Sequence, residues 1–155
     1  MKRTVTSLAL ASLVVSTVAF AQPAANQKHA EWATKVRKAN FTLLGHNMGP
    51  LGGMLKGKVP FNAEVVQEKA TNINHLANMI ADTSKVDTSK FNVETEALNG
   101  IWTEQDDYAE KIKALVMASE RVSKIALTGS EAEVKKAMGQ IGKACGSCHD
   151  SYKKD

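Results

Sequence analysis

The chain has 155 residues, of which 43% are hydrophobic, with a formal net charge of +4 and two cysteines. A chain of this length is expected to form one domain around a single core. Its weak positive charge is spread along the sequence without an accompanying stripe of aromatic residues, which argues against nucleic acid as a partner.

The first 21 residues have the form of a secretory signal peptide. They contain a basic start, Met1-Lys2-Arg3, a mostly apolar run over 8–20 and a small-x-small site, Ala19-Phe20-Ala21. The apolar run is short for a membrane span. We therefore expect cleavage after Ala21 and a periplasmic mature domain of residues 22–155 without a membrane span. A retained N-terminal anchor is the alternative. The sequence neither predicts nor excludes cyclisation of Gln22, the new N-terminal residue.

Helical periodicity predicts two helices in the first half of the chain. The first extends from Asn26 to Lys56, where apolar residues recur every three or four positions, and several glycines and Pro50 should bend its second half. A loop containing Pro60 ends it. Asn62 is a good N-cap for the second helix, which extends from Ala63 to Ala81.

The second half begins with a polar connection over 82–100, followed by two more helices. Thr103 and Asp106 resemble a weak capping box for a helix that ends near Leu127, and Ser130 with Glu133 forms a capping box for the last helix. Four amphipathic helices of these lengths predict an all-α fold, an antiparallel four-helix bundle.

Both cysteines belong to one segment of the last predicted helix, Cys145-Gly146-Ser147-Cys148-His149. At ~100° per residue, the two sulfurs and the imidazole share one narrow face on the core side of that helix. This spacing is typical of covalent haem attachment, with a thioether from each cysteine and the histidine as an axial ligand of the iron. The sequence therefore predicts one haem c held by Cys145 and Cys148, with His149 on the iron.

Other interpretations of the cysteine pair explain less. A local disulfide would close a very short loop and leave His149 without a role. A zinc site would need further ligands at suitable spacing. A thioredoxin-like pair belongs at the start of a helix after a strand, whereas these cysteines lie about four turns into a helix.

The position of this motif at the end of the chain resembles the cytochromes c′, the class II haem c proteins with a four-helix bundle and high-spin iron. Several other segments are also similar to that family: Arg37 with Phe41, Met48-Gly49-Pro50, Lys56-Gly57, Pro60-Phe61 and Ile101-Trp102. The resemblance covers essentially the whole chain after residue 21. It implies an iron with His149 as its one protein ligand.

The resemblance also implies roles for other residues around the haem. Phe41 would cover the open face of the iron, and Arg37, with Lys38 beside it, would lie near a haem propionate. Lys153 would lie on the proximal side, although lysine cannot copy the forked hydrogen bonds of an arginine there. The plainer alternatives are a buried core residue for Phe41 and a solvated surface residue for Arg37.

Other residues are weaker candidates for a sixth iron ligand, which must come from upstream of the motif. His29, His46 and His75 are expected at the surface or in caps. Met48 is the residue that a six-coordinate relative would use, although it lies ~10 Å of helix beyond Phe41. The other methionines of the predicted helices are expected to fill gaps in the core: Met54, Met79, Met117 and Met138.

An apolar lid over five-coordinate iron favours nitric oxide and carbon monoxide, because bound dioxygen needs a hydrogen-bond donor. We therefore expect a protein that binds these gases, scavenges or senses nitric oxide, and is capable of electron transfer. The alternative is a six-coordinate, low-spin electron carrier that uses Met48. An enzyme is not expected, since a peroxidase needs a distal acid or base that Phe41 does not supply.

The resemblance further implies partners for the chain. Members of that family commonly form homodimers through their first two helices, so a homodimer and redox-partner proteins are expected. It also implies that nitric oxide displaces His149 and finishes on the proximal side of the haem.

Overall fold

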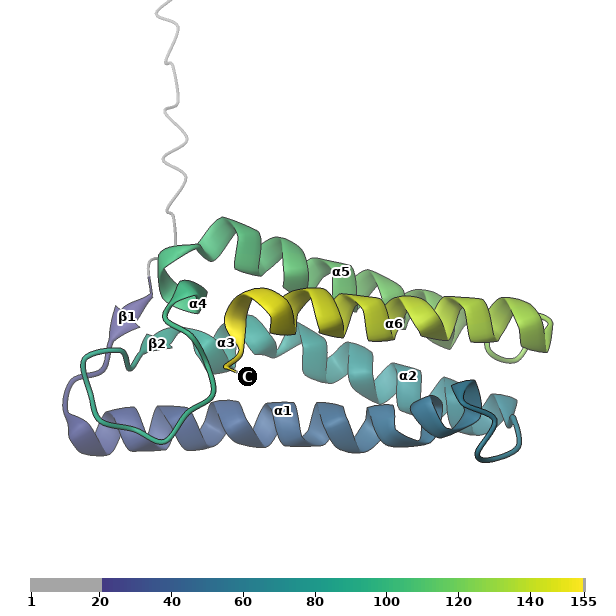
Figure 1. The fold of residues 1–155 in the computed structure, drawn as a ribbon, viewed down its shortest axis with the longest axis horizontal. Helices are drawn as coiled ribbons and strands as arrows, with labels where there is room; N and C mark the ends of the chain where they lie inside the picture. Colours follow the sequence, from purple (N-terminus) through teal and green to yellow (C-terminus); the bar gives the residue numbers. More distant parts are fainter. Residues whose placement is uncertain (1–20, 155) are drawn as a thin grey trace, which may run out of the picture.

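The computed structural model describes residues 21–154, and four long helices lie side by side in it (Figure 1). They are α1 (Gln27–Leu55), α2 (Ala63–Asn78), α5 (Gln105–Ile125) and α6 (Glu131–Tyr152). Helix α2 packs against both α1 and α5, and α5 packs against α6, whereas α1 and α6 make few direct contacts. The predicted all-α four-helix bundle is confirmed.

Four short elements gather at one end of the bundle (Figure 1). They are β1 (Gln22–Pro23), β2 (Val86–Asp87), α3 (Ile80–Ser84) and α4 (Gly100–Thr103). β1 pairs with β2 in parallel, so the first residues after the expected cleavage site are attached to the long connection. The signal peptide itself lies, apart from Ala21, outside the described residues and stays a prediction. Among residues 21–154, none of the helices combines the length and apolar character that a bilayer crossing requires.

Two of the long helices, α2 and α6, begin at the predicted caps, and α1 begins after a cap at Asn26, the predicted start of that helix. The side chains of Asn26 and Asn62 accept hydrogen bonds from backbone N–H groups three residues later, at 2.9 and 2.8 Å. Ser130 and Glu133 form a reciprocal capping box at the start of α6. These hydrogen bonds from Ser130 hold the pKa of the Glu133 carboxyl below its usual value. The local sequence therefore determines where α1, α2 and α6 start.

The predicted capping box at Thr103 is wrong. Thr103 is the last residue of the short helix α4, and α5 begins at Gln105 without a side-chain cap. The cause lies in the neighbouring Trp102, which is buried and whose indole N–H donates to the Ser84 carbonyl at 2.9 Å. This tertiary contact folds residues 100–103 into a separate helical turn.

The core is formed mainly by the apolar stripes of α2, α5 and α6, and the last turns of α1 add to it. Met54 and Met138 belong to it as expected, but the expectation for the other two methionines is wrong, since Met79 and Met117 are more than half exposed. Met117 follows the buried Leu115 by two positions, which turns its side chain to the outer face of α5. Helical spacing identified the stripe, but not every apolar residue belongs to it.

Helix α1 buries several polar side chains and exposes large apolar ones, although Leu51 and Met54 near its end belong to the core. Asn40 donates to the Leu76 carbonyl of α2 at 3.2 Å, and Asn47 accepts from Asn72 at 3.1 Å. Trp32 and Leu43, in contrast, are 63% and 50% exposed. Side-chain hydrogen bonds therefore contribute to the attachment of α1 to the bundle, and an apolar face of α1 remains on the outside.

We predict that Ser130→Ala lowers the free energy of unfolding by about 1 kcal/mol, because the first backbone N–H groups of α6 lose their acceptor. Ser123→Ala, which removes an exposed hydroxyl from the interior of α5, is the matched control and should change stability by less than about 0.5 kcal/mol. Urea unfolding of both variants measures the difference. Equal losses would contradict the capping role.

Candidate functional site

A cavity of about 550 Å³ lies between α1 and α6, on the side of α6 that carries the cysteine motif. Its floor is apolar and comes from several helices, with Ile73, Leu115 and Ile141 among the lining residues. The loop residues 95–97 and the first turn of α4 line one end of it. The bundle therefore leaves one large hollow space beside the motif.

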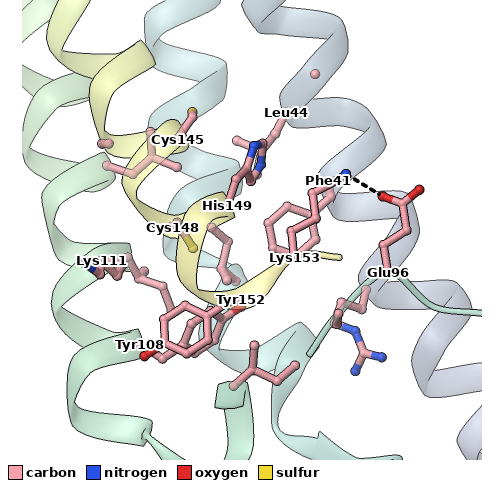
Figure 2. A pocket seen from close by; sticks show the side chains of 18 of the residues that line it. Phe41, Leu44, Glu96, Tyr108, Lys111, Cys145, Cys148, His149, Tyr152 and Lys153 are labelled. Atoms are coloured by element: carbon pink, nitrogen blue, oxygen red, sulfur yellow. Dashed lines mark ion pairs between the residues drawn. The ribbon is translucent and has the colours of Figure 1, made fainter. Parts of the chain in front are cut away.

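The three residues of the motif line this cavity together. Cys145 and Cys148 are half-buried free thiols, and Figure 2 shows them on the inner turns of α6 with His149 beside them. Burial raises the pKa of both thiols, that of Cys148 to about 11, although the nearby Lys111 opposes the rise. The predicted sharing of one helix face is confirmed by this arrangement.

Arg37 projects from α1 into the end of the cavity that residues 95–97 line, and it is only 2% exposed. Its Nη2 donates to the hydroxyls of Thr88 and Thr95 at 3.4 and 3.5 Å, and its guanidinium lies 5.1 Å from the centre of the Trp102 ring. Burial lowers the pKa of this guanidinium, yet arginine remains charged in proteins. The alternative of a solvated surface arginine is wrong.

The Nη1 atom of Arg37 is buried and has no hydrogen-bond partner among residues 21–154. A buried, charged donor without a partner is costly unless an anionic group accepts from it. A flat apolar group with carboxylate substituents would fit both the apolar floor of the cavity and this donor. Haem has that chemistry, so the described residues fit it.

Phe41 lines the α1 wall of the cavity and is 36% exposed, so the alternative of a buried core residue is wrong, while its place over the open face of the iron stays a prediction. Its ring borders the hollow space, whereas the buried Asn40 and Asn47 of α1 are bonded to α2. Leu44 lines the same wall. The part of the α1 wall that Phe41 and Leu44 form is therefore apolar.

The two predicted lysines also line the cavity, where each pairs with a carboxylate from the long connection. Lys38 lies 3.9 Å from Glu94, and Lys153 lies 3.1 Å from Glu96. Both side chains are about half exposed. The ammonium groups therefore lie at the rim of the cavity, where solvent screens them.

Two buried tyrosines line the cavity beside Cys148, and the sequence did not indicate them as site residues. The rings of Tyr108 and Tyr152 meet edge to face at 5.1 Å. The Tyr152 phenol donates to Asp107 at 2.6 Å, and burial together with this carboxylate raises its pKa. Gly100 leaves room for the ring, because a Cβ there would lie 2.9 Å from it. Their helical spacing was the one available signal, since Tyr108 precedes the buried Leu115 by seven residues and Tyr152 follows the buried Ile141 by eleven.

The other candidate ligands are distributed unevenly around this site. Met48 is half-buried and lines the cavity with Phe41, so its distance along α1 does not remove it from the site. His29, His46 and His75 are exposed and do not line the cavity. His29 accepts a hydrogen bond from the backbone of Ala25, in keeping with the expected capping role.

Comparison with known proteins matches residues 32–153 to the family described as cytochrome C′. Cytochrome c-554 of Cereibacter sphaeroides is 35% identical, with 97% of each chain covered. The cytochrome c′ structure from Shewanella frigidimarina has a TM-score of 0.75 and 33% identity, and the match covers 84% of this chain and all of that one. A ferrous variant of Alcaligenes xylosoxidans cytochrome c′ with bound NO has a TM-score of 0.71 and 25% identity, with coverage of 81% and 96%.

We predict that Arg37→Gln destabilises the haem-loaded protein by about 1.5–3 kcal/mol, because the charge-assisted hydrogen bonds to Thr88 and Thr95 are lost. Arg121→Gln, on the exposed side of α5, is the matched control and should have an effect below about 0.5 kcal/mol. Thermal unfolding checks this difference. A similar loss in both variants would show that the buried contacts contribute nothing specific.

Proposed function

Since the chain belongs to the cytochrome c′ family, whose members carry covalently attached haem c, we propose that it is a periplasmic monohaem cytochrome that binds nitric oxide and carbon monoxide. Its physiological role is the scavenging or sensing of nitric oxide, and it is capable of electron transfer with redox-partner proteins. The periplasmic location rests on the predicted signal peptide of residues 1–21.

Three side chains of α6 hold the haem in this proposal. Cys145 and Cys148 would each attach the macrocycle through a thioether, and His149 would be the protein ligand of the iron. Haem supplies the iron, which takes the gas ligand and changes between ferric and ferrous states. Arg37 would donate to a haem propionate with Nη1, which has no partner among the described residues, and Lys38 and Lys153 lie at the rim.

The observation that carries the gas specificity is the apolar character of the α1 wall. Phe41 and Leu44 have no hydrogen-bonding group, and the neighbouring Thr42 hydroxyl already donates to the Lys38 carbonyl at 2.8 Å. A ligand beside Phe41 and Leu44 therefore meets no stabilising donor from these two side chains, and Arg37 and Lys38 are assigned to the propionate side. This disfavours dioxygen more than nitric oxide or carbon monoxide. The Alcaligenes xylosoxidans structure with bound NO supports the same assignment.

We do not propose an enzymatic activity. A peroxidase needs an acid or base over the iron to assist cleavage of the O–O bond. Among the described α1 residues that line the cavity, none carries a carboxylate or an imidazole. The α1 wall therefore supports ligand binding rather than catalysis.

A second candidate is a six-coordinate, low-spin electron carrier in which Met48 binds the iron. It is favoured by the position of Met48, whose thioether side chain lines the same cavity as His149 from the opposite wall. Methionine paired with histidine is a common ligand set of electron-transfer cytochromes. The two candidates differ in coordination number, which a spectrum reports.

We also propose that the chain forms a homodimer through α1 and α2. Trp32, Val36 and Leu43 recur at helical spacing on α1, and the first and last of these are at least half exposed. Apolar side chains at such positions form a stripe on one side of a helix. A second copy of the chain would cover this stripe.

We predict a high-spin ferrous absorption spectrum and binding of both carbon monoxide and nitric oxide by the haem-loaded protein. Phe41→Ala should raise the rate of carbon monoxide association about tenfold, which corresponds to a steric barrier of about 1.4 kcal/mol from the lid. Leu43→Ala, on the outer face of α1, is the control and should leave the rate unchanged. Flash photolysis measures these rates.

A low-spin spectrum with sharp α and β bands that becomes high-spin in Met48→Leu would contradict the five-coordinate proposal. It would establish Met48 as the sixth ligand and assign the protein to the electron carriers.

We predict that Leu43→Glu weakens dimerisation at least tenfold, since each protomer loses apolar burial of about 1.5–3 kcal/mol and gains a charge in the interface. Met117→Glu places the same charge on the exposed face of α5 and should leave the association constant unchanged. Sedimentation velocity over a range of concentrations separates the two. A wild-type chain that stays monomeric would contradict the proposed dimer.

A further inference from the structure

The end of α6 is attached by backbone hydrogen bonds to the connection between the second and third long helices. We name residues 88–98 of this connection the strap. Lys153 pairs with Ala97 in an antiparallel bridge, the Leu98 N–H donates to the Tyr152 carbonyl at 2.9 Å, and the Lys154 N–H donates to the Glu96 carbonyl at 2.7 Å. The chain therefore leaves α6 directly into a two-stranded pairing with the strap.

Side chains reinforce this pairing. Lys153 Nζ lies 3.1 Å from Glu96 Oε2, and Figure 2 marks this ion pair beside Phe41 at the cavity. Lys154 Nζ donates to the Thr95 carbonyl at 3.0 Å. Two successive residues after α6 thus hold the same part of the strap through both backbone and side chain.

The other side of the strap is attached to α1. Arg37 donates to Thr95, Lys38 pairs with Glu94, and the Gln27 amide donates to the Asn92 carbonyl at 2.8 Å. Helices α1 and α6 form opposite walls of the cavity and make few direct contacts. The strap is therefore a structural connection between the Phe41 wall and the His149 wall.

The attachment acts on the turn that carries His149. The last carbonyl groups of a helix have no partners within the helix, so an unsupported last turn frays. Here the Lys153 N–H donates to the His149 carbonyl at 3.1 Å. The strap bonds to the residues on either side of Lys153: the Leu98 N–H donates to the Tyr152 carbonyl, and the Glu96 carbonyl accepts from the Lys154 N–H. The backbone of His149 is thus held from its C-terminal side by residues that the strap keeps in place.

We propose that the strap restrains His149 and slows its replacement on the iron by an incoming gas ligand, with Glu96 as a positioning residue that acts through Lys153. This inference rests on the proposed gas-binding function. Within residues 21–154, Glu96 makes no hydrogen bond or ion pair with His149, so its influence passes through the Lys153 ion pair and the paired backbone. The strap thus affects how firmly the protein holds His149 on the iron and does not select which gas binds.

The test uses the full haem-loaded protein and stopped-flow mixing of its ferrous form with nitric oxide. Glu96→Gln should accelerate the replacement of His149 about two- to fivefold, the effect of losing an exposed ion pair. A chain that ends at Lys153 loses both hydrogen bonds of Lys154 and should show a larger acceleration. The initial association of nitric oxide should be unchanged in both variants.

Two controls separate this role from a general loss of stability. Asp82→Asn breaks the exposed Lys85–Asp82 pair on α3, which is 2.7 Å long and distant in sequence from the motif, and should leave the replacement rate unchanged. In a Lys153→Met background, Glu96→Gln should have no further effect, because its partner is already absent. A further acceleration in that background would overturn the assigned route.

Equal rates of His149 replacement in wild type and both strap variants would overturn the inference. Equal changes in the rates of nitric oxide association and of His149 replacement would overturn it as well.

The wild-type chain can also keep His149 on the iron when nitric oxide binds. In that case, a form without the iron–His149 bond that appears in the variants supports the restraint by the strap, and the absence of this form overturns it. If nitric oxide does not bind, the proposed function fails. In that case the iron–histidine Raman band of the gas-free ferrous protein tests the restraint on His149 by itself. A shift of this band in the strap variants would support the restraint, and an unchanged band would refute it.

Discussion

The separation of α1 from α6 is the constraint on which the site depends. Close packing joins α1 to α2, α2 to α5 and α5 to α6, but the fourth side of the bundle has few direct contacts. The resulting cavity of about 550 Å³ is bordered by Phe41 on one wall and by the cysteine motif on the other. A bundle closed on all four sides by apolar packing would leave no comparable space.

This open side explains the unusual character of α1. A helix that cannot use its cavity-facing residues for packing needs other attachments, and Asn40, Asn47 and Arg37 make them through hydrogen bonds to α2 and the strap. Such bonds are directional, and buried polar networks favour one arrangement over others more than apolar contacts do. They define the position of α1 relative to α6, and with it the distance between the walls.

The chemistry follows from the same arrangement. Helix α6 brings two thiols and an imidazole to the cavity, while α1 contributes an apolar surface and a buried guanidinium with one unpaired donor. A haem c protein of this family needs covalent attachment on one side and a defined environment for the ligand on the other. The strap adds a connection between the two walls, which links the environment of the Arg37 guanidinium to the turn that carries His149.

The sequence alone determined the helices, the caps at Asn62 and Ser130, and the haem motif, because each depends on residues within a few positions of one another. Only the tertiary structure decided that Trp102 forms a separate turn, that Arg37 is buried, that Phe41 borders open space, and that Glu96 meets Lys153. These contacts join residues from distant segments, and helical spacing carries no information about which segment will lie opposite a given face.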